Sequence, residues 1–256
     1  MEKNFYEVGK WYGDRVGFPR VGLVNKEAVL IKDSFEFLKL LVDRKRIKIE
    51  IQRRNSRIDV KEQIQILSQE LEIKPREIYV VDNKHMKGDY AFRVFTQSRV
   101  IFRELQQLSE TPQNYSDEVV AQFLAGLADA EATVDMRNNI VSFSISNKKA
   151  QDAEKIRLLL EKILRLPIKI RTAGKIELKI ETPKYIFDIF RDRIGKFMKH
   201  PEKLKRLEGK FISKKDASYL NFFKTNNNPK IMAEKFKIHE DSARRIIRQF
   251  RKQNLI

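Results

Sequence analysis

The sequence predicts an α+β fold with two pseudo-symmetric αββαββα repeats and a smaller all-α domain. Three observations support this prediction. Short segments alternate apolar and polar residues, as strands do, and the segments between them have helical spacing. The order of these segments recurs in the two halves of the chain. The final part shows helical spacing alone. The predicted domains are therefore residues 1–110, 117–208 and 212–256.

The second half has the clearer rhythm. The stretch "NIVSFSISN" places Val141, Phe143 and Ile145 on one side and serines on the other, which predicts a strand with one apolar face. Residues 148–166 then switch to helical spacing. A hairpin follows around "TAG" at 172–174, and a helix begins near 183. With the apolar helical stretch at 123–134, this gives the order helix, two strands, helix, two strands, helix.

The first half echoes this order. Residues 20–41 resemble 141–163, and residues 89–105 resemble 175–190. The first copy carries an extra amphipathic helix at 60–73. Between the copies, "PQNYSDE" predicts a linker in which Ser116 or Asp117 caps the next helix. Two such units can pack about a pseudo-twofold axis and join their sheets into one long surface.

The charge of the chain indicates a polyanionic partner. The net charge is +18 and the pI is about 9.9. Residues 184–256 hold 20 basic and 8 acidic residues, a balance of +12. Nucleic acid is the first candidate and an anionic membrane surface the second. Solvated charge from a lysine-rich proteome is the alternative.

Other features narrow the class of protein. No apolar run approaches the ~18 residues of a membrane span, and the N-terminus lacks a signal core. With no cysteine and only three histidines, disulfides and thiolate metal sites are excluded and a histidine metal site is disfavoured. These features fit a cytoplasmic, nucleoid-associated protein.

The stretch "FLAGLADAEATV" at 123–134 combines small residues with a carboxylate end. Its alanines and Gly126 allow two helix backbones to approach closely, so we expect this helix to pack against a twin. Asp129 and Glu131 lie at its end. Two carboxylates held close together both ionise when a divalent cation lies between them. Such cations can hold the attacking and leaving oxygens of a phosphodiester.

The residues "LAGLADAEA" at 124–132 closely resemble the LAGLIDADG motif of homing endonucleases. The order of elements and the tail "IGKFMKHPEKLKRL" at 194–207 are also similar to that family. The resemblance implies a saddle-shaped fold whose sheet face lies along double-stranded DNA. It implies cleavage with Mg²⁺ or Mn²⁺ where the two motif helices meet, by a monomer that carries both copies. Glu131 replaces the usual Asp, and Ala132 the final Gly.

The resemblance assigns roles to particular residues of the second copy. Glu131 falls on the metal-binding acid of the family. Asn147 falls on a polar residue that organises the water shell, and Lys179 on a basic residue that supports the transition state.

The first copy matches the motif less well. "EVGKWYGDR" at 7–15 places Gly9 on the central Gly and Asp14 on the acid, so Asp14 and Glu131 together would hold the metal. Asn25 then corresponds to Asn147, and Arg93 to Lys179. Lys10, Trp11 and Arg15 depart from the motif. The alternative interpretation is a short N-terminal helix with a surface Asp.

One face of the second set of strands suits DNA. Hydroxyl and basic groups at every second position fit phosphates and base edges, and Glu177 is the only acid we place among them. A solvated sheet face would look similar. The predicted DNA-binding residues of this face are Ser142, Ser144, Ser146, Lys169, Arg171 and Lys175.

Residues 229–252 have the spacing of a helix-turn-helix. Pro229 begins the first helix, with Ile231, Met232, Ala233 and Phe236 on its apolar side. The turn "KIH" has Lys237 where glycine often stands. Glu240, Asp241 or Ser242 caps the second helix. The residues predicted to face DNA are Ser242, Arg244, Arg245, Arg248, Arg251 and Lys252. A helical bundle with a basic exterior is the alternative.

Two functions from different classes follow. The first is a metal-dependent, sequence-specific DNA endonuclease, with Lys179 and Arg93 neutralising charge that develops during cleavage. The second is a catalytically inactive scaffold acting as a DNA-binding transcriptional regulator. RNA binding, as in intron maturases that share this fold, is a third possibility.

Overall fold

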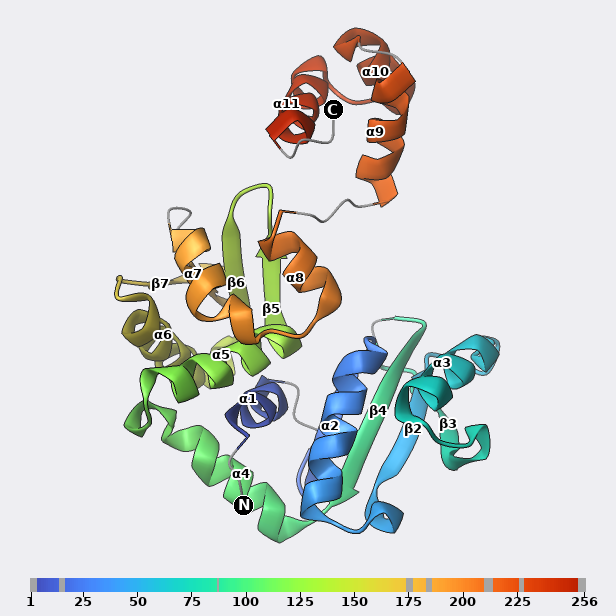
Figure 1. Cartoon of the computed structure of the whole chain (residues 1–256), viewed down its shortest axis with the longest axis vertical. Helices are drawn as coiled ribbons and strands as arrows, with labels where there is room; N and C mark the ends of the chain where they lie inside the picture. Colours follow the sequence, from blue (N-terminus) through green and yellow to red (C-terminus); the bar gives the residue numbers. More distant parts are fainter. Residues whose placement is uncertain are drawn as a thin grey trace.

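The computed structural model describes residues 4–13, 17–86, 88–173, 177–182, 186–209, 214–225 and 228–252. Two αβ repeats come first in the chain, and a helical unit follows them (Figure 1). The α+β fold class is confirmed.

The first repeat surrounds a four-stranded sheet. Its strands lie in the order β1-β4-β2-β3, with β3 parallel to β2 and the other pairs antiparallel. Its elements are α1 (Phe5–Gly13), β1 (Arg20–Asn25), α2 (Ala28–Leu41), β2 (Lys48–Arg53), α3 (Lys61–Leu71), β3 (Ile78–Asp82), β4 (Tyr90–Gln97) and α4 (Arg99–Glu110). The extra helix predicted at 60–73 is α3.

The second repeat follows the predicted order of elements. Its sheet is antiparallel in the order β5-β6-β8-β7. Its elements are α5 (Asp117–Glu131), β5 (Ala132–Asp135), β6 (Ile140–Ser146), α6 (Ala150–Leu164), β7 (Lys169–Ala173), β8 (Glu177–Glu181), α7 (Phe187–Arg193) and α8 (Pro201–Leu207). The Ser116 side chain accepts a hydrogen bond from the Val119 N–H at 3.5 Å, so Ser116 caps α5 as predicted.

The repeats differ at the edges of their sheets, and here one prediction is wrong. Two strands were expected after the first helix, but the described residues 17–19 form a turn and only β1 follows. The first sheet instead gains β3 at its opposite edge. Two parallel strands need a crossover connection, and α3 supplies it between β2 and β3.

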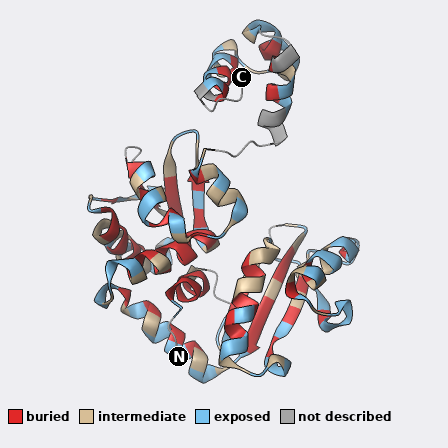
Figure 2. Cartoon of the chain, viewed as in Figure 1, coloured by how far each residue is buried: buried red, intermediate tan, exposed pale blue. Residues whose placement is uncertain are grey.

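The single long surface formed by the two sheets stays a prediction. The described strands form two four-stranded sheets with no strand pair between them. What joins the repeats is the helix pair α1 and α5, which lies between the two sheets (Figure 1). One cluster of buried side chains runs from Phe5 to Leu207 through both repeats (Figure 2). The repeats therefore share a core although they do not share a sheet.

The C-terminal helices have a core of their own. They are α9 (Lys214–Thr225), α10 (Pro229–Phe236) and α11 (Glu240–Lys252). Their buried residues are Tyr219, Leu220, Phe223, Met232, Ala233, Ala243, Ile246, Ile247 and Phe250. Ile231, which was predicted on the apolar side of α10, is 42% exposed, because that helix turns Met232 and Ala233 inward instead. Within the described residues, no helix combines the length and apolar character that crossing a membrane requires.

Candidate functional site

The site is organised by the close contact of α1 with α5. A Cβ atom added at Gly9 would lie 1.9 Å from the carbonyl oxygen of Phe123, and one added at Gly126 would lie 1.9 Å from that of Tyr6. Any other residue at either position would collide with backbone. The prediction that the two helices touch at these glycines is confirmed.

This contact places Glu131 at the last position of α5, where its side chain is exposed. The corresponding acid of the first copy, Asp14, lies outside the described residues, so its predicted place beside Glu131 stays a prediction. The backbone turns directly from Glu131 into β5 at Ala132. The carboxylate is therefore held where a helix end meets the sheet of the second repeat.

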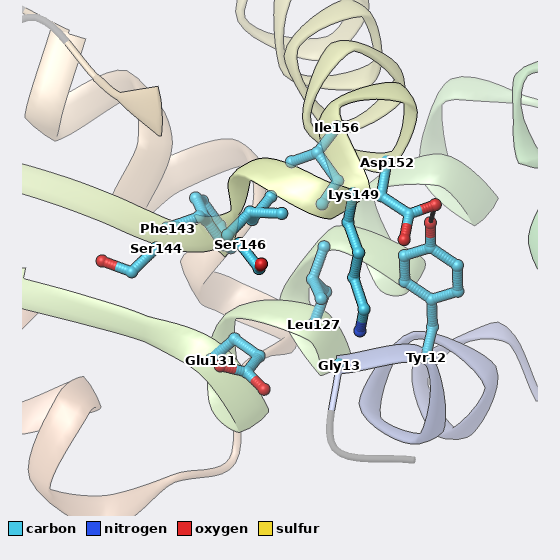
Figure 3. A pocket seen from close by; sticks show the side chains of 11 residues that line it. Tyr12, Gly13, Leu127, Glu131, Phe143, Ser144, Ser146, Lys149, Asp152 and Ile156 are labelled. Atoms are coloured by element: carbon cyan, nitrogen blue, oxygen red, sulfur yellow. Dashed lines mark hydrogen bonds between the residues drawn. The ribbon is translucent and has the colours of Figure 1, made fainter. Parts of the chain in front are cut away.

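A pocket of about 230 Å³ opens beside Glu131 (Figure 3). Four elements form its wall: the end of α1, the end of α5, the strand β6 and the start of α6. The lining residues are Tyr12, Gly13, Leu127, Glu131, Phe143, Ser144, Ile145, Ser146, Lys149, Asp152 and Ile156. Both repeats contribute to it, since Tyr12 and Gly13 come from the first.

Lys149 supplies a positive charge to this pocket. It is the residue directly before α6, and its side chain extends into the pocket between Glu131 and Tyr12 (Figure 3). The Tyr12 hydroxyl donates a hydrogen bond of 2.6 Å to Asp152 Oδ1, which fixes the opposite wall. Sequence reasoning missed Lys149, Tyr12 and Asp152. The available signal was that Lys149 follows a strand with a polar face.

Two lysines act on the Glu131 carboxyl. Although the Glu131 side chain reaches solvent, partial desolvation by the surrounding atoms raises its pKa, and the charges of Lys203 and Lys149 act against that rise. The Lys203 ammonium also donates to the carbonyl oxygens of Ala128, at 2.8 Å, and Asp129, at 2.7 Å, at the end of α5. A cation at a helix C-terminus is favourable because the carbonyls there carry partial negative charge.

The donor set fits a hard divalent cation that is completed by substrate. The described residues contain no group of three or more His, Asp or Glu able to hold a metal. Magnesium, however, is commonly bound by one or two carboxylates together with water and substrate phosphates. Glu131 at the mouth of an open pocket provides such a carboxylate. The predicted Mg²⁺ or Mn²⁺ is therefore compatible with this side chain.

Two predicted catalytic bases lie elsewhere. Lys179 is on β8 and pairs with Glu181 at 2.9 Å. Arg93 is on β4, where it pairs with Glu50 at 3.2 Å and stacks 4.2 Å above the ring of Phe95. Neither residue lines the pocket. Lys179 nevertheless lies opposite Ser144, a pocket residue, on the neighbouring strand. The catalytic roles of Lys179 and Arg93 stay predictions.

The two predicted asparagines lie where strands end. The Asn25 side chain accepts a hydrogen bond of 3.0 Å from the Glu27 N–H, so it shapes the start of α2. Asn147 begins a short 3₁₀ turn, Asn147–Lys149, directly after β6. Its side chain lies outside the described part of the structure, so its role as a water ligand stays a prediction.

The predicted DNA face of the second sheet is partly revised. Ser144, Ser146, Lys169 and Arg171 are exposed, but Ser142 is only 5% exposed and is not available to DNA in this conformation. Lys175 lies outside the described residues. The statement that Glu177 is the only acid on this face is wrong. Glu181 shares the face and lies 3.5 Å from Arg171 as well as pairing with Lys179.

The C-terminal unit presents arginines on α11. Arg245, Arg248 and Arg251 are exposed, while Arg244 pairs with Glu240 at 2.6 Å. Ser242 is half-buried, and the Lys252 side chain is not among those described. None of the three predicted caps takes that role. His239 Nδ1 instead accepts from the Asp241 N–H at 3.3 Å, because α11 already begins at Glu240.

Comparison with known proteins gives a fold likeness only. No family model matches the chain, and no curated protein matches it in sequence. I-DmoI in complex with DNA and Mn has a TM-score of 0.48 at 16% identity, over 75% of this chain and 94% of that chain. Mesophilic variants of the homing endonuclease I-DmoI have a TM-score of 0.46 at 18% identity, over the same shares. At such scores and identities these likenesses do not establish a function, so the residues of this chain must support it.

Proposed function

We propose that this chain is a DNA endonuclease of the LAGLIDADG type. It binds double-stranded DNA along the outer face of the β5–β8 sheet and hydrolyses a phosphodiester at the Glu131 pocket. One observation supports this most directly. Ser144 and Ser146 are exposed on the outer sheet face and also line the pocket, so a duplex on that face would lie over Glu131.

The side chains of the pocket divide the chemistry among them. Glu131 would hold Mg²⁺ or Mn²⁺, which acidifies water and stabilises charge on the phosphoryl group. Lys149 donates hydrogen bonds to a non-bridging phosphate oxygen and neutralises the charge that develops there. Tyr12, held by its hydrogen bond to Asp152, keeps the far wall in place. The apolar residues Leu127, Phe143 and Ile156 restrict the water that can enter.

DNA binding draws on the charge of the whole chain. Lys169 and Arg171 flank the pocket face, and the exposed arginines of α11 suit a major groove if α10 and α11 act as a helix-turn-helix. The net charge of +18 favours duplex binding through phosphate contacts. We expect the affinity for duplex DNA to fall steeply as salt rises from 50 to 200 mM, by about 10³-fold for six phosphate contacts. A flat salt response would contradict duplex binding of this kind.

The inactive regulator is the second candidate. One observation favours it. The two strand bases, Arg93 and Lys179, are held in ion pairs with Glu50 and Glu181, which would reduce their ability to assist cleavage. A scaffold that had lost its catalytic bases would keep its DNA-binding surfaces. The open pocket with Lys149 is the reason that we prefer the enzyme.

A cleavage assay separates the two candidates. A randomised library of linear duplexes is incubated with the protein and Mg²⁺, and the experiment is repeated with Glu131→Gln. Glu118→Gln is the matched control, because Glu118 is an exposed acid in the first turn of the same helix. The enzyme predicts that cutting is lost in Glu131→Gln alone while duplex binding persists. Tight binding by the wild type with no cutting in Mg²⁺ or Mn²⁺ would support the regulator.

A further inference from the structure

The two sides of the α1–α5 pair, one facing each repeat, are not equivalent. Gly9 and Gly126 set the register between the helices, so the residues three positions later, Tyr12 and Asp129, correspond. Tyr12 lines the open pocket beside Glu131. Asp129 is 0% exposed. The side of the helix pair that faces the first repeat is thus covered, whereas the side that faces the second repeat opens into the pocket.

The cover is the segment that leads into α8. Asp129 Oδ2 accepts hydrogen bonds from the backbone N–H groups of Lys199, at 2.6 Å, and His200, at 3.2 Å. The Tyr6 hydroxyl donates to the same oxygen at 2.6 Å. The Lys199 ammonium lies 3.1 Å from Asp33 Oδ2, which ties the segment to α2 of the first repeat. Lys203 adds its bonds to the last carbonyls of α5.

The residues immediately before α6 and α2, which correspond in the two repeats, carry opposite charges. Lys149 immediately precedes α6 and extends into the pocket, whereas the residue immediately before α2 is Glu27. Burial raises the pKa of Glu27, as does the charge of Glu202, while Lys203 opposes the rise. Residues of α8 are therefore close to Glu27. Glu27 therefore does not supply the positive charge that Lys149 would offer to a phosphate on the other side.

Among the residues that the structure describes, an open pocket with an acid and a lysine is found only on the side of the second repeat, and we propose that this chain therefore nicks one strand of its duplex. The inference rests on the proposed endonuclease function. In the step at Glu131, a water oxygen bonds to phosphorus and one bridging P–O bond to the sugar breaks. The leaving oxygen takes up a proton, so one water is consumed for each nick. The strand over the first repeat meets Glu27 and the segment 199–203 instead, and it stays intact.

A supercoiled plasmid distinguishes the outcomes. Duplexes that the protein retains from a randomised library are cloned into the plasmid, which is then incubated with the full chain and Mg²⁺ or Mn²⁺. Losing one positioned acid–base group slows cleavage by about 10²-fold. We therefore expect open circles to form about 100-fold faster than linear plasmid, and strand-specific end labels to show a single cut strand.

Each result has a separate meaning. Linear plasmid forming as fast as open circles would overturn the single-pocket inference and leave the endonuclease intact. Plasmid that is bound but stays supercoiled would overturn the endonuclease and the nicking inference with it. Nicking that survives in Glu131→Gln would also overturn the inference, because the cut would then not come from the pocket described.

Discussion

The two motif helices do different work in the same packing arrangement. When the helices are aligned on Gly9 and Gly126, Glu7 and Lys10 of α1 correspond to Leu124 and Leu127 of α5. In α1 the pair is an ion pair of 2.8 Å with both side chains buried. Ser34 donates to Glu7 at 3.0 Å, and Lys10 donates to the carbonyl of Leu30 at 3.0 Å. The helix α5 of the second repeat is thus apolar at these positions, whereas α1 of the first repeat uses them for polar contacts with α2.

This difference shows that the close contact of the two helices depends on the glycines and not on the side chains beside them. The glycines are needed in both helices because backbone meets backbone. The residues around the glycines differ between the helices, because each set contacts its own repeat. In the second repeat they line a pocket, and in the first they hold α1 in place. The departures of the first motif from the family pattern at Lys10 and Trp11 are therefore structural, since both side chains are buried.

The largest expected effect comes from breaking the buried pair. Lys10→Leu should destabilise the fold by about 3 to 5 kcal/mol, because it leaves the Glu7 carboxylate buried without its cation. The double variant Glu7→Leu/Lys10→Leu, which copies α5, should recover most of that loss, since replacing a buried ion pair by leucines is often neutral. Urea unfolding of the two variants checks this. Equal destabilisation in both would show that the side-chain volumes matter and the charges do not.

The next effect compares the open side of the helix pair with the covered side. Lys149→Met should slow DNA cleavage by about 10²-fold while duplex binding changes little, because a positioned cation stabilises the developing charge. Glu27→Gln, at the corresponding position of α2, should leave the cleavage rate within twofold of wild type. Single-turnover cleavage of the selected duplex measures both. A loss of similar size in the two variants would mean that both sides of the helix pair participate.

Much of the fold could be predicted from local patterns. Alternation located β6 and β8, helical spacing located α6, and the run of small residues predicted the contact at Gly126. These features are encoded within short segments. The parallel strand β3 was missed because pairing with β2 depends on the crossover through α3, which no local period reveals. The hydrogen bond from Lys199 to Asp129 joins residues 70 positions apart, so local patterns could not predict it either.

The site was less predictable than the fold. Glu131 followed from the motif, but Lys149 sits in a turn between a strand and a helix, where no period marks which way a side chain points. Lys179 has the expected chemistry and strand face, yet Glu181 two residues later neutralises it at 2.9 Å. Alternation places both residues on one face, but it does not show that they pair.

A smaller effect concerns the segment leading into α8, which covers Asp129. Burial, and then the charge of Lys203, lower the pKa of His200 to about 4 from its ordinary 6.5. Between these values the unfolded chain binds a proton that the folded chain does not. The stability is therefore complete above pH 6.5 and declines as the pH falls toward 4, by an amount of order 1 kcal/mol after solvent screening.

The variant His200→Asn tests this assignment. His200 Nδ1 accepts from the Lys203 N–H at the start of α8, and asparagine can cap a helix in the same way. Thermal unfolding from pH 7 to pH 4 should show a shallower loss of stability in His200→Asn than in wild type. An identical slope in the two proteins would assign the acid sensitivity to groups other than His200.

The smallest expected effect extends the comparison to the C-terminal helices. Lys237 ends α10 with a φ of 51°, a left-handed conformation that glycine adopts without a Cβ penalty. Lys237→Gly should stabilise the α9–α11 unit by about 0.5 to 1 kcal/mol. Glu72→Gly, at the φ of 54° that ends α3, should do the same for the main body. Glu234→Gly, inside α10, should instead cost about 1 kcal/mol, because glycine weakens a helix interior. Urea unfolding followed with probes in each core measures all three, and a destabilised Lys237→Gly would mean that the lysine side chain itself holds the turn.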